Sequence, residues 1–551
     1  MFADYWEWRL AQSPELATEV GRHEYGHRWT DWSKGARDKA REHRRDLLQQ
    51  VLYVNSAGNL TESMRLSANL LERELRTALD TEAYSYLVLR VSQQYGAHTQ
   101  VFSTVGSMPA RSVTDYENII ARLRALPTYI DQTIALVREQ IAAGLVQPEV
   151  VVDRVIDQVQ AQSRPAATES PLLAAFTRVP AEISAADQQR LRQQAFAAYE
   201  QQFVPSWKRY EAFLRDEYRP TARPQIALTT VPGGRQLYEQ AVRFHTTTSL
   251  TPEQIHELGL NEVARIDREM EQIARADGFS GSATEYEQQL ATRRGMTFDS
   301  QQEMLDYARD VLNRLEPAVP KLFKRLPKTP VLIRPIPADR EASTASNYET
   351  GTPDGARPAF FNMNTYRPQE QERYTIEALV IHETVPGHHL QLAIARELGG
   401  LPEFQKRFST TAFVEGWALY AESLGTELGI YREPPSKFGQ LASEKFRAVR
   451  LVVDTGMHAM GWSRERAREY FAAHVPAQSI AEIDRYIAWP GQALAYKVGQ
   501  LKIRELRMRA EQELGGRFDV REFHDVVLRN GALPLDMLEQ QVEGYIRDAR
   551  N

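Results

Sequence analysis

The chain has 551 residues, 42% of them hydrophobic, which suffices for a large buried core in one lobed body or in two to three subdomains. It carries 67 lysines and arginines against 73 acidic residues, a formal net charge of -6, and both signs are mixed along its length. Because neutralising phosphates requires a concentrated basic face, this balance argues against nucleic acid as the main partner. The absence of cysteine excludes disulfides and thiolate metal sites, so any transition metal must be held by His, Asp or Glu.

The sequence predicts no membrane span. No apolar stretch approaches the roughly 20 residues that cross a bilayer, and the first residues show neither the basic start nor the apolar core of a signal peptide. We therefore expect a soluble chain. A cytoplasmic protein and a periplasmic or secreted protein without its signal peptide would both fit, and no pattern indicates an oligomeric state.

Apolar residues recur every three or four positions over most of the chain, which predicts a mainly α-helical fold. The pattern is clear over residues 48–53, 64–79, 116–136 and 191–214. It breaks at residues 161–185, which are rich in Ala, Pro, Ser and Thr. We interpret that segment as an exposed connection and a weak domain boundary.

A capping box predicts the start of a long helix in the middle of the chain. Thr251 stands at the N-cap, Pro252 at the first helical position and Gln254 at the third. The periodicity that follows predicts a helix through Ala274.

We expect an N-terminal helical region over residues 1–250 and a second region over residues 251–551, although a single domain divided by a cleft also fits. Strands are predicted only between residues 330 and 365, where PVLIRPIP and AFFNMN flank a loop rich in Ser, Thr, Gly, Asp and Pro. Helical periodicity returns at Gln371. A small mixed sheet should therefore precede the helices of about residues 372–430.

Residues 376–391 read IEALVIHETVPGHHLQ, an apolar helix that presents His382, Glu383, His388 and His389 within eight positions. In HExxH motifs two histidines four residues apart share one helical face and chelate zinc, and the intervening Glu faces the metal-bound water. Here the histidines are six or seven residues apart. On a regular helix they would face apart or lie about 10 Å apart along the axis.

Pro386 and Gly387 would allow the helix to become irregular, because Pro removes a backbone donor and Gly permits unusual dihedral angles. A bulge or break there would bring the second histidine back, as in an HExxH motif with two inserted residues. We favour His388 over His389 as the second ligand, because the Gly-His pair matches the end of many HExGH motifs. The alternative is a helix break with solvent-exposed histidines.

Two histidines need a third protein ligand, and the segment FVEGWALYAESLG offers Glu415, 27 residues after His388. That length accommodates a helix, a turn at GGLP and a second helix packed back across the first. Glu422 would lie on the same face two turns later, either orienting a histidine or as an ordinary solvated residue. Three protein ligands leave zinc an open position for water; Glu383 would take the proton of that water while the metal polarises a carbonyl group.

Four segments in this order, HETVPGHHLQ, FVEGWALYAE, LVVDTGMHAMGWSRERA and WPGQALAYKVGQ, resemble the bacterial domain of unknown function 885 family. HExxxxH followed by FVE also resembles the zinc peptidases of the thimet oligopeptidase and oligoendopeptidase type. That resemblance implies zinc ligation by His382, His388 and Glu415, Glu383 as general base, and a mostly helical body with a deep cleft that admits short peptides. The inserted Pro-Gly pair departs from those peptidases and leaves the second histidine open.

The same resemblance implies a strand that holds the substrate. In such peptidases an edge strand pairs with the substrate backbone, and the segment from Phe360 to Asn364 is the candidate here, with Phe360, Asn362 and Asn364 as contact residues. The alternative is a strand that only supports the zinc-binding helix.

Peptide hydrolysis develops negative charge on the carbonyl oxygen, and a Tyr or His often receives it. Tyr496 resembles the tyrosines that oligopeptidases supply from a late helix, and Gln492 one turn earlier would share its face. His458 is the second candidate. A packing role is the alternative for both Tyr496 and His458.

The sequence thus predicts a mainly α protein with a small sheet, in which residues 251–551 form the catalytic region of a zinc-dependent peptidase acting on short peptides. One rival is a zinc hydrolase of esters or non-peptide amides, because the same activated water attacks any carbonyl. The other is a non-catalytic helical metal-binding protein, in which Glu383 would be idle.

Overall fold

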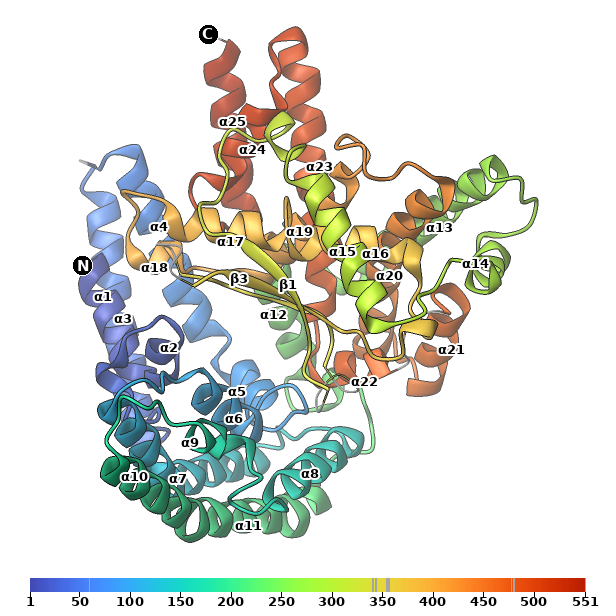
Figure 1. Cartoon of the computed structure of the whole chain (residues 1–551). Coiled ribbons are helices and arrows are strands. Elements are labelled where there is room, and N and C mark those ends of the chain that lie inside the picture. The colour runs from blue at the N-terminus through green and yellow to red at the C-terminus, as the bar shows by residue number, and fades with distance from the viewer. Residues whose placement is uncertain are drawn as a thin grey trace. The chain divides into compact units, whose positions relative to one another are not determined.

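A computed structural model describes residues 1–58, 60–338, 341, 344–352, 357–476, 478 and 481–550 (Figure 1). The chain divides into two compact units. One consists of Met1–Gln240 with Asp484–Trp489, and the other of Ala241–Ile483 with Pro490–Asn551. The division falls within α12 (Gly234–Thr246) and α22 (Ala481–Ala488).

Among the described residues of the first unit, the regular secondary structure is helical, apart from the isolated bridges Val91–Gly96 and Pro148–Arg223. Its α-helices are α1 (Phe2–Gln12), α2 (Pro14–Glu19), α3 (Lys34–Ser56), α4 (Glu62–Asp80), α5 (Glu82–Arg90), α6 (Ala97–Ser107), α7 (Val113–Ala142), α8 (Glu149–Ser163), α9 (Ala174–Thr177), α10 (Ala185–Ala198) and α11 (Val204–Ala212). Two π-helical segments and four 3-10 turns join them: η3 (Tyr199–Phe203), η4 (Phe213–Tyr218), η1 (His23–Tyr25), η2 (Pro171–Leu173), η5 (Arg219–Thr221) and η6 (Leu228–Thr230). The Ala- and Pro-rich residues 161–185 lie inside this unit and contain η2 and α9, so the weak boundary predicted there does not divide the two units.

The second unit combines helices with one sheet. Its helices, apart from those at the division, are α13 (Pro252–Ala276), α14 (Ala283–Thr292), α15 (Gln301–Leu315), α16 (Arg373–Glu383), α17 (His388–Glu397), α18 (Glu403–Lys406), α19 (Thr411–Leu424), α20 (Pro434–His458), α21 (Arg464–His474), α23 (Ala495–Leu514), α24 (Val520–Leu528) and α25 (Leu535–Arg550). Short 3-10 turns are η7 (Val319–Lys321), η8 (Pro368–Glu370), η9 (Gln492–Leu494) and η10 (Gly515–Arg517). The prediction of a mainly α fold is confirmed.

The capping box predicted at Thr251 is present. The Thr251 hydroxyl accepts a hydrogen bond from the Gln254 amide at 3.2 Å, and the Gln254 side chain accepts one from the Thr251 amide at 2.9 Å. These reciprocal bonds satisfy two backbone donors that the first turn of α13 would otherwise leave without partners.

The sheet has three strands in the order β1-β3-β2, formed by Val331–Pro335, Ala359–Met363 and Asn347–Glu349. β1 pairs with β3 in parallel and β2 pairs with β3 antiparallel, so the predicted mixed sheet is confirmed. β2 lies in a segment whose composition predicted only a loop. The sheet lies beside α17, because the Glu397 carboxylate at the end of that helix accepts hydrogen bonds from the backbone of Lys328 and Thr329 just before β1.

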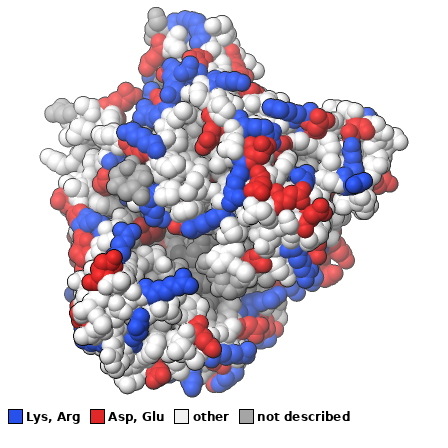
Figure 2. All heavy atoms as spheres, viewed as in Figure 1, with Lys and Arg blue, Asp and Glu red and all other residues white. Residues whose placement is uncertain are grey.

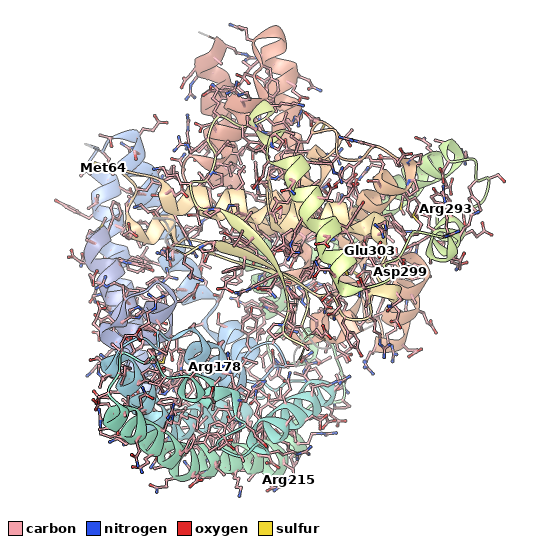
Figure 3. All side chains as sticks on the ribbon, viewed as in Figure 1. Met64, Arg178, Arg215, Arg293, Asp299 and Glu303 are labelled. Carbon is pink, nitrogen blue, oxygen red and sulfur yellow. The ribbon has the colours of Figure 1, made fainter. Side chains whose placement is uncertain are left out.

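Helix α16, which follows the sheet, is fixed at its beginning by α15. Figure 3 labels Asp299 and Glu303 there, and the Glu303 carboxylate accepts a hydrogen bond from the Asp299 amide at 2.7 Å and forms an ion pair with Arg373. One helical turn further on, Arg314 of α15 pairs with the buried Glu377 at 2.9 Å. These contacts hold α16, whose far end carries His382.

Charged side chains of both signs are interspersed over the face shown in Figure 2, as the sequence predicts. Among the described residues, no helix combines the length and apolarity that crossing a bilayer requires.

Candidate metal centre

The motif helix breaks where the sequence predicts it. α16 ends at Glu383, α17 begins at His388, and residues 384–387 connect them. The Gly387 amide donates to the Ile381 carbonyl at 3.1 Å, so the connection folds back against the end of α16. A Cβ atom at Gly387 would lie 2.1 Å from the His382 carbonyl oxygen, which only glycine avoids.

The break brings together the three predicted ligands. His382 Nε2 lies 3.6 Å and His388 Nε2 3.3 Å from Glu415 Oε2, and the ligand atoms of the three residues lie within 4.8 Å of one another. Both histidines are buried, and about one-fifth of the Glu415 side chain is exposed. Two imidazole nitrogens and one carboxylate are a donor set that catalytic zinc sites use, with a coordination position left over.

His389 faces away from this group. Its Nδ1 lies 3.1 Å from the Tyr348 hydroxyl on β2, and burial lowers the pKa of its ring to about 4. Of the two histidines that the sequence left open, His388 therefore joins His382 and Glu415, whereas His389 ties α17 to the sheet.

Glu422 is completely buried and orients the His382 ring. Its Oε1 lies 2.8 Å from His382 Nδ1 and 3.6 Å from Arg447 Nη2, and the Tyr431 hydroxyl donates to its backbone carbonyl at 2.8 Å. A carboxylate on Nδ1 keeps the proton on that nitrogen and leaves Nε2 free to bind a metal. Sequence reasoning missed Arg447 and Tyr431, because neither belongs to a ligand motif and only the packing of α20 and the loop after α19 brings them here.

The charges within the site are strongly coupled. Burial opposes ionisation of Glu415, but His388 and His382 outweigh it and hold the pKa of this carboxyl well below its usual range. Burial likewise disfavours a charged His382, yet its contacts with Glu415 and Glu422 raise the pKa of its ring to about 9. The carboxylates of Glu415 and Glu422 therefore stabilise positive charge at His382, whether a proton or a metal cation supplies it.

Glu383 is buried beside the histidines but does not belong to the group of three ligand atoms. Burial raises the pKa of its carboxyl above the usual range, although His388 and His382 counteract that effect. A carboxyl group beside a metal site can accept a proton from a metal-bound water and return it later in the reaction.

Helix α19, which carries Glu415, is fixed from two sides. The Trp417 indole donates to the Pro386 carbonyl at 2.9 Å, which joins α19 to the helix break. On the other side Gly416 meets Gly499 of α23, where an added Cβ on Gly416 would lie 2.5 Å from the Gly499 Cα. Glu415 therefore lies where three backbone segments meet at close range.

A family model described as "Bacterial protein of unknown function (DUF885)" matches residues 14–542. The chain belongs to this family. Two solved structures are similar to this DUF885 protein. One, from Colwellia psychrerythraea and described as a "putative lipoprotein", is 26% identical with a TM-score of 0.94, over 99% of this chain and 98% of that one. The other, from Shewanella oneidensis and described as a "putative lipoprotein of unknown function", is 19% identical with a TM-score of 0.76, over 98% of both chains, and shows the fold alone. Among curated proteins, none matches.

The strand predicted to pair with a substrate in this DUF885 protein is not an edge strand. β3 lies between β1 and β2, so both of its backbone edges are already paired, and the prediction for the segment from Phe360 to Asn364 is wrong in this respect. Within the described residues, β1 and β2 form the edges. Strand β2 could not be predicted from the sequence, because it has only three residues and no apolar alternation.

The side chains of that segment contact the sheet and its loops. The Arg334 guanidinium lies 3.7 Å from the centroid of the Phe360 ring and donates to Asn362 at 2.7 Å. The Asn364 amide donates to the backbone carbonyls of Glu341 and Thr344, each at 2.7 Å. A substrate contact by these side chains stays a prediction.

Tyr496 lies in the first turn of α23, one turn before Gly499, and is half-buried with the Arg450 guanidinium 4.6 Å from its ring centroid. Gln492 is buried in η9 immediately before this helix. Their roles in catalysis stay predictions. His458 is fully buried at the end of α20, and its role in catalysis likewise stays a prediction.

Proposed function

We propose that this DUF885 protein is a zinc-dependent peptidase that hydrolyses short peptides. The observation that carries the proposal is the approach of His382, His388 and Glu415 to one another across a broken helix, with the buried Glu383 beside them. Glu422 on His382 Nδ1 supports it further, because metal-ligating histidines usually donate their other ring N–H to a carboxylate or carbonyl.

The residues of the site fit a zinc ion. Their donor atoms are two Nε2 nitrogens and a carboxylate oxygen, in a chain without cysteine. Zinc, when bound, would lower the pKa of a coordinated water and polarise the carbonyl of the scissile bond. Glu383 would accept a proton from the attacking water and deliver it to the departing amine, so that hydroxyl and hydrogen are added across the peptide bond.

The first test is the metal content of the purified protein. We expect about one zinc per chain, lost on treatment with a strong chelator and restored by adding zinc. His388→Ala should abolish binding, whereas the matched variant His389→Ala should retain it, because His389 faces Tyr348. Iron in place of zinc would indicate the other chemistry that two histidines and a carboxylate support, and the proposal would then be wrong.

The second test is hydrolysis of a mixed library of short peptides beside simple esters and non-peptide amides. Zinc-dependent cleavage of peptides supports the proposal, and cleavage confined to esters would assign the site to another hydrolase. A protein that binds zinc and cleaves none of these substrates would be a metal-binding protein without turnover.

Tyr496 is the proposed donor to the oxyanion. Tyr496→Phe should lower kcat by about 10² to 10³ and leave KM nearly unchanged, as expected when one transition-state hydrogen bond is lost. Full activity of this variant would return Tyr496 to the packing residues.

A further inference from the structure

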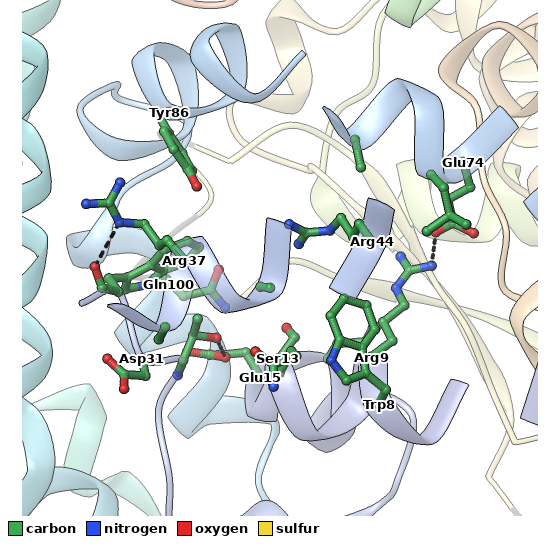
Figure 4. Close-up of a pocket in the computed structure, with 18 of the residues that line it drawn as sticks. Trp8, Arg9, Ser13, Glu15, Asp31, Arg37, Arg44, Glu74, Tyr86 and Gln100 are labelled. Atoms are coloured by element: carbon green, nitrogen blue, oxygen red, sulfur yellow. Dashed lines mark hydrogen bonds and ion pairs between the residues drawn. The ribbon is translucent and has the colours of Figure 1, made fainter. Parts of the chain in front are cut away.

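The first unit contains a cavity of about 470 Å³ that the proposed peptidase chemistry does not use (Figure 4). Its walls come from α1 to α7 and from the segment before α3. Its size lies within the range of about 300 to 1,000 Å³ that small-molecule sites occupy. Five of its lining residues are aromatic, namely Tyr5, Trp8, Trp32, Tyr86 and Tyr129.

The walls carry four arginines and three carboxylates. The arginines are Arg9, Arg37, Arg44 and Arg90, and the carboxylates are those of Glu15, Asp31 and Glu74. All three carboxylates have partners within the protein: Glu74 pairs with Arg9, Glu15 accepts two hydrogen bonds from Thr30, and Asp31 accepts from Ser33 and Gln132. Arg37 pairs with Glu139, which lies outside the lining.

Two of the arginines have no carboxylate partner among the described residues. Arg44 lies over the Trp8 ring, 5.6 Å from its centroid, and Figure 4 shows it among the lining side chains without a dashed contact, in contrast to Arg9 and Glu74. Arg90 lies over the Trp32 ring at 4.1 Å, and its Nε is buried without a hydrogen bond. Glu15 acts on Arg90 electrostatically but forms no ion pair with it.

A buried guanidinium without an anion is unfavourable, because its charge has lost water without gaining a counter-charge. Stacking on an indole face compensates only part of that loss. It also holds the guanidinium plane, so that its N–H edge stays available for a planar anion. A cavity that is lined by aromatic rings and by an arginine without a carboxylate partner therefore has the features of an anion-binding site.

We propose that this cavity binds a small carboxylic acid with a flat apolar part, whose carboxylate is held by Arg90, with Arg44 adding positive charge, and whose ring packs against Trp8, Trp32 and Tyr86. The three carboxylates in the walls favour a ligand with a single negative charge, because they would repel a doubly charged phosphate more strongly. Arginine pairs with a carboxylate through two parallel N–H···O bonds, which selects for planar anions.

The proposal is tested by isothermal titration calorimetry on the full chain with hippurate, indole-3-acetate and N-acetylphenylalanine. The amide of each acid is the neutral control, and phenyl phosphate probes the doubly charged alternative. At least one of the acids should bind saturably, and about tenfold more tightly than its amide or than phenyl phosphate.

Three variants locate the site. Arg90→Gln and Arg44→Gln should each weaken binding of the acid about tenfold or more. Arg28→Gln removes an exposed arginine that lies over Tyr25 outside the cavity, and it should leave the affinity unchanged. If Arg90→Gln fails to fold, as judged by circular dichroism, the half-buried Arg44 carries the test.

Chelator-treated protein should bind the same acid with the same affinity, which separates this site from the metal centre. Three results would overturn the proposal: none of the acids binds, phenyl phosphate binds more tightly than the acids, or the affinity is unaffected by both arginine variants. Loss of peptidase activity alone would not affect it.

Discussion

His382 has a carboxylate on each side of its ring. Glu422 takes the Nδ1 side at 2.8 Å and Glu415 faces Nε2 at 3.6 Å. Because Glu422 is completely buried, its negative charge is screened little by water, and it fixes both the tautomer and the orientation of the imidazole.

Replacing Glu422 with Gln should weaken zinc binding about 10- to 100-fold, the usual effect of changing a residue that orients a metal ligand. Gln retains the size of the side chain but removes the charge that makes the imidazole a better donor. Competition with a chromophoric zinc chelator measures the affinity. Glu427→Gln, which removes the ion pair between the exposed Glu427 and Arg507 but no contact of His382, is the control and should bind zinc as the unmodified protein does. Equal affinities for both variants would show that Glu422 has a packing role only.

Glu383→Gln should retain zinc and the fold while lowering turnover by about 10² or more, because an amide cannot accept the proton of the attacking water. Metal content and kcat must be measured on the same preparation. A variant that lost zinc together with activity would make Glu383 a ligand or a structural residue, and the general-base role would be wrong.

At the scale of elements, the metal centre depends on the four-residue connection between α16 and α17. It returns His388 to His382 in spite of a spacing that a regular helix would not allow. Gly387 makes this fold-back sterically accessible, and the Trp417 indole of α19 holds it through the Pro386 carbonyl.

Gly387→Ala should therefore displace His388 and abolish tight zinc binding, because the new Cβ would lie 2.1 Å from the His382 carbonyl oxygen and the backbone would have to move. We expect Tm to fall as well, as for other strained backbone substitutions. Gly399→Ala, just after the same helix, adds its Cβ in open space and is the matched control. Zinc measured at one per chain in Gly387→Ala would contradict this role.

Several elements can be predicted from the local sequence alone, whereas others depend on tertiary packing, for which the sequence has no local signal. The capping box at Thr251, the two longer strands and the break at Pro386–Gly387 are determined by neighbouring residues, and each was predictable. The position of β3 between β1 and β2 depends on a three-residue strand that carries no pattern of its own. The contact of Arg447 with Glu422 depends on how α20 packs, which no motif encodes.

At the scale of the whole molecule, each of the two units buries a neutral histidine that is not among the three candidate metal ligands. In the first unit, burial lowers the pKa of His98 to about 4, and its Nε2 lies 3.0 Å from Gln158. In the second unit, burial lowers the pKa of His524 to about 3, while its ring is held between the Leu322 carbonyl and the Tyr420 hydroxyl. Arg507 donates to the same hydroxyl at 3.1 Å, and a neutral His524 ring with its proton on Nδ1 would donate to Leu322 and accept the Tyr420 proton at Nε2.

Both histidines should make the protein less stable in mild acid. An unfolded histidine has a pKa of about 6.5, so between about pH 6.5 and the folded values the unfolded state binds protons that the folded state does not, and stability falls as the pH falls. Each histidine contributes about 1.4 kcal/mol per pH unit within this window. Buried carboxyls such as Glu287, whose pKa burial raises to about 7, act with the opposite sign, so only a comparison with variants isolates the histidines.

His524→Gln should therefore lower the stability at pH 7, because it alters the hydrogen bonds of the ring. Between pH 7 and pH 4.5, however, the variant should lose less stability than the unmodified protein does. Scanning calorimetry from pH 7 to pH 4.5 provides the measurement. If the two units unfold in separate transitions, His524→Gln should flatten the pH dependence of one transition and His98→Gln that of the other. His23→Gln, at an exposed position, should alter neither. Parallel Tm profiles for the unmodified protein and His524→Gln would show that His524 titrates alike in the folded and unfolded states, in contradiction to its buried, neutral environment.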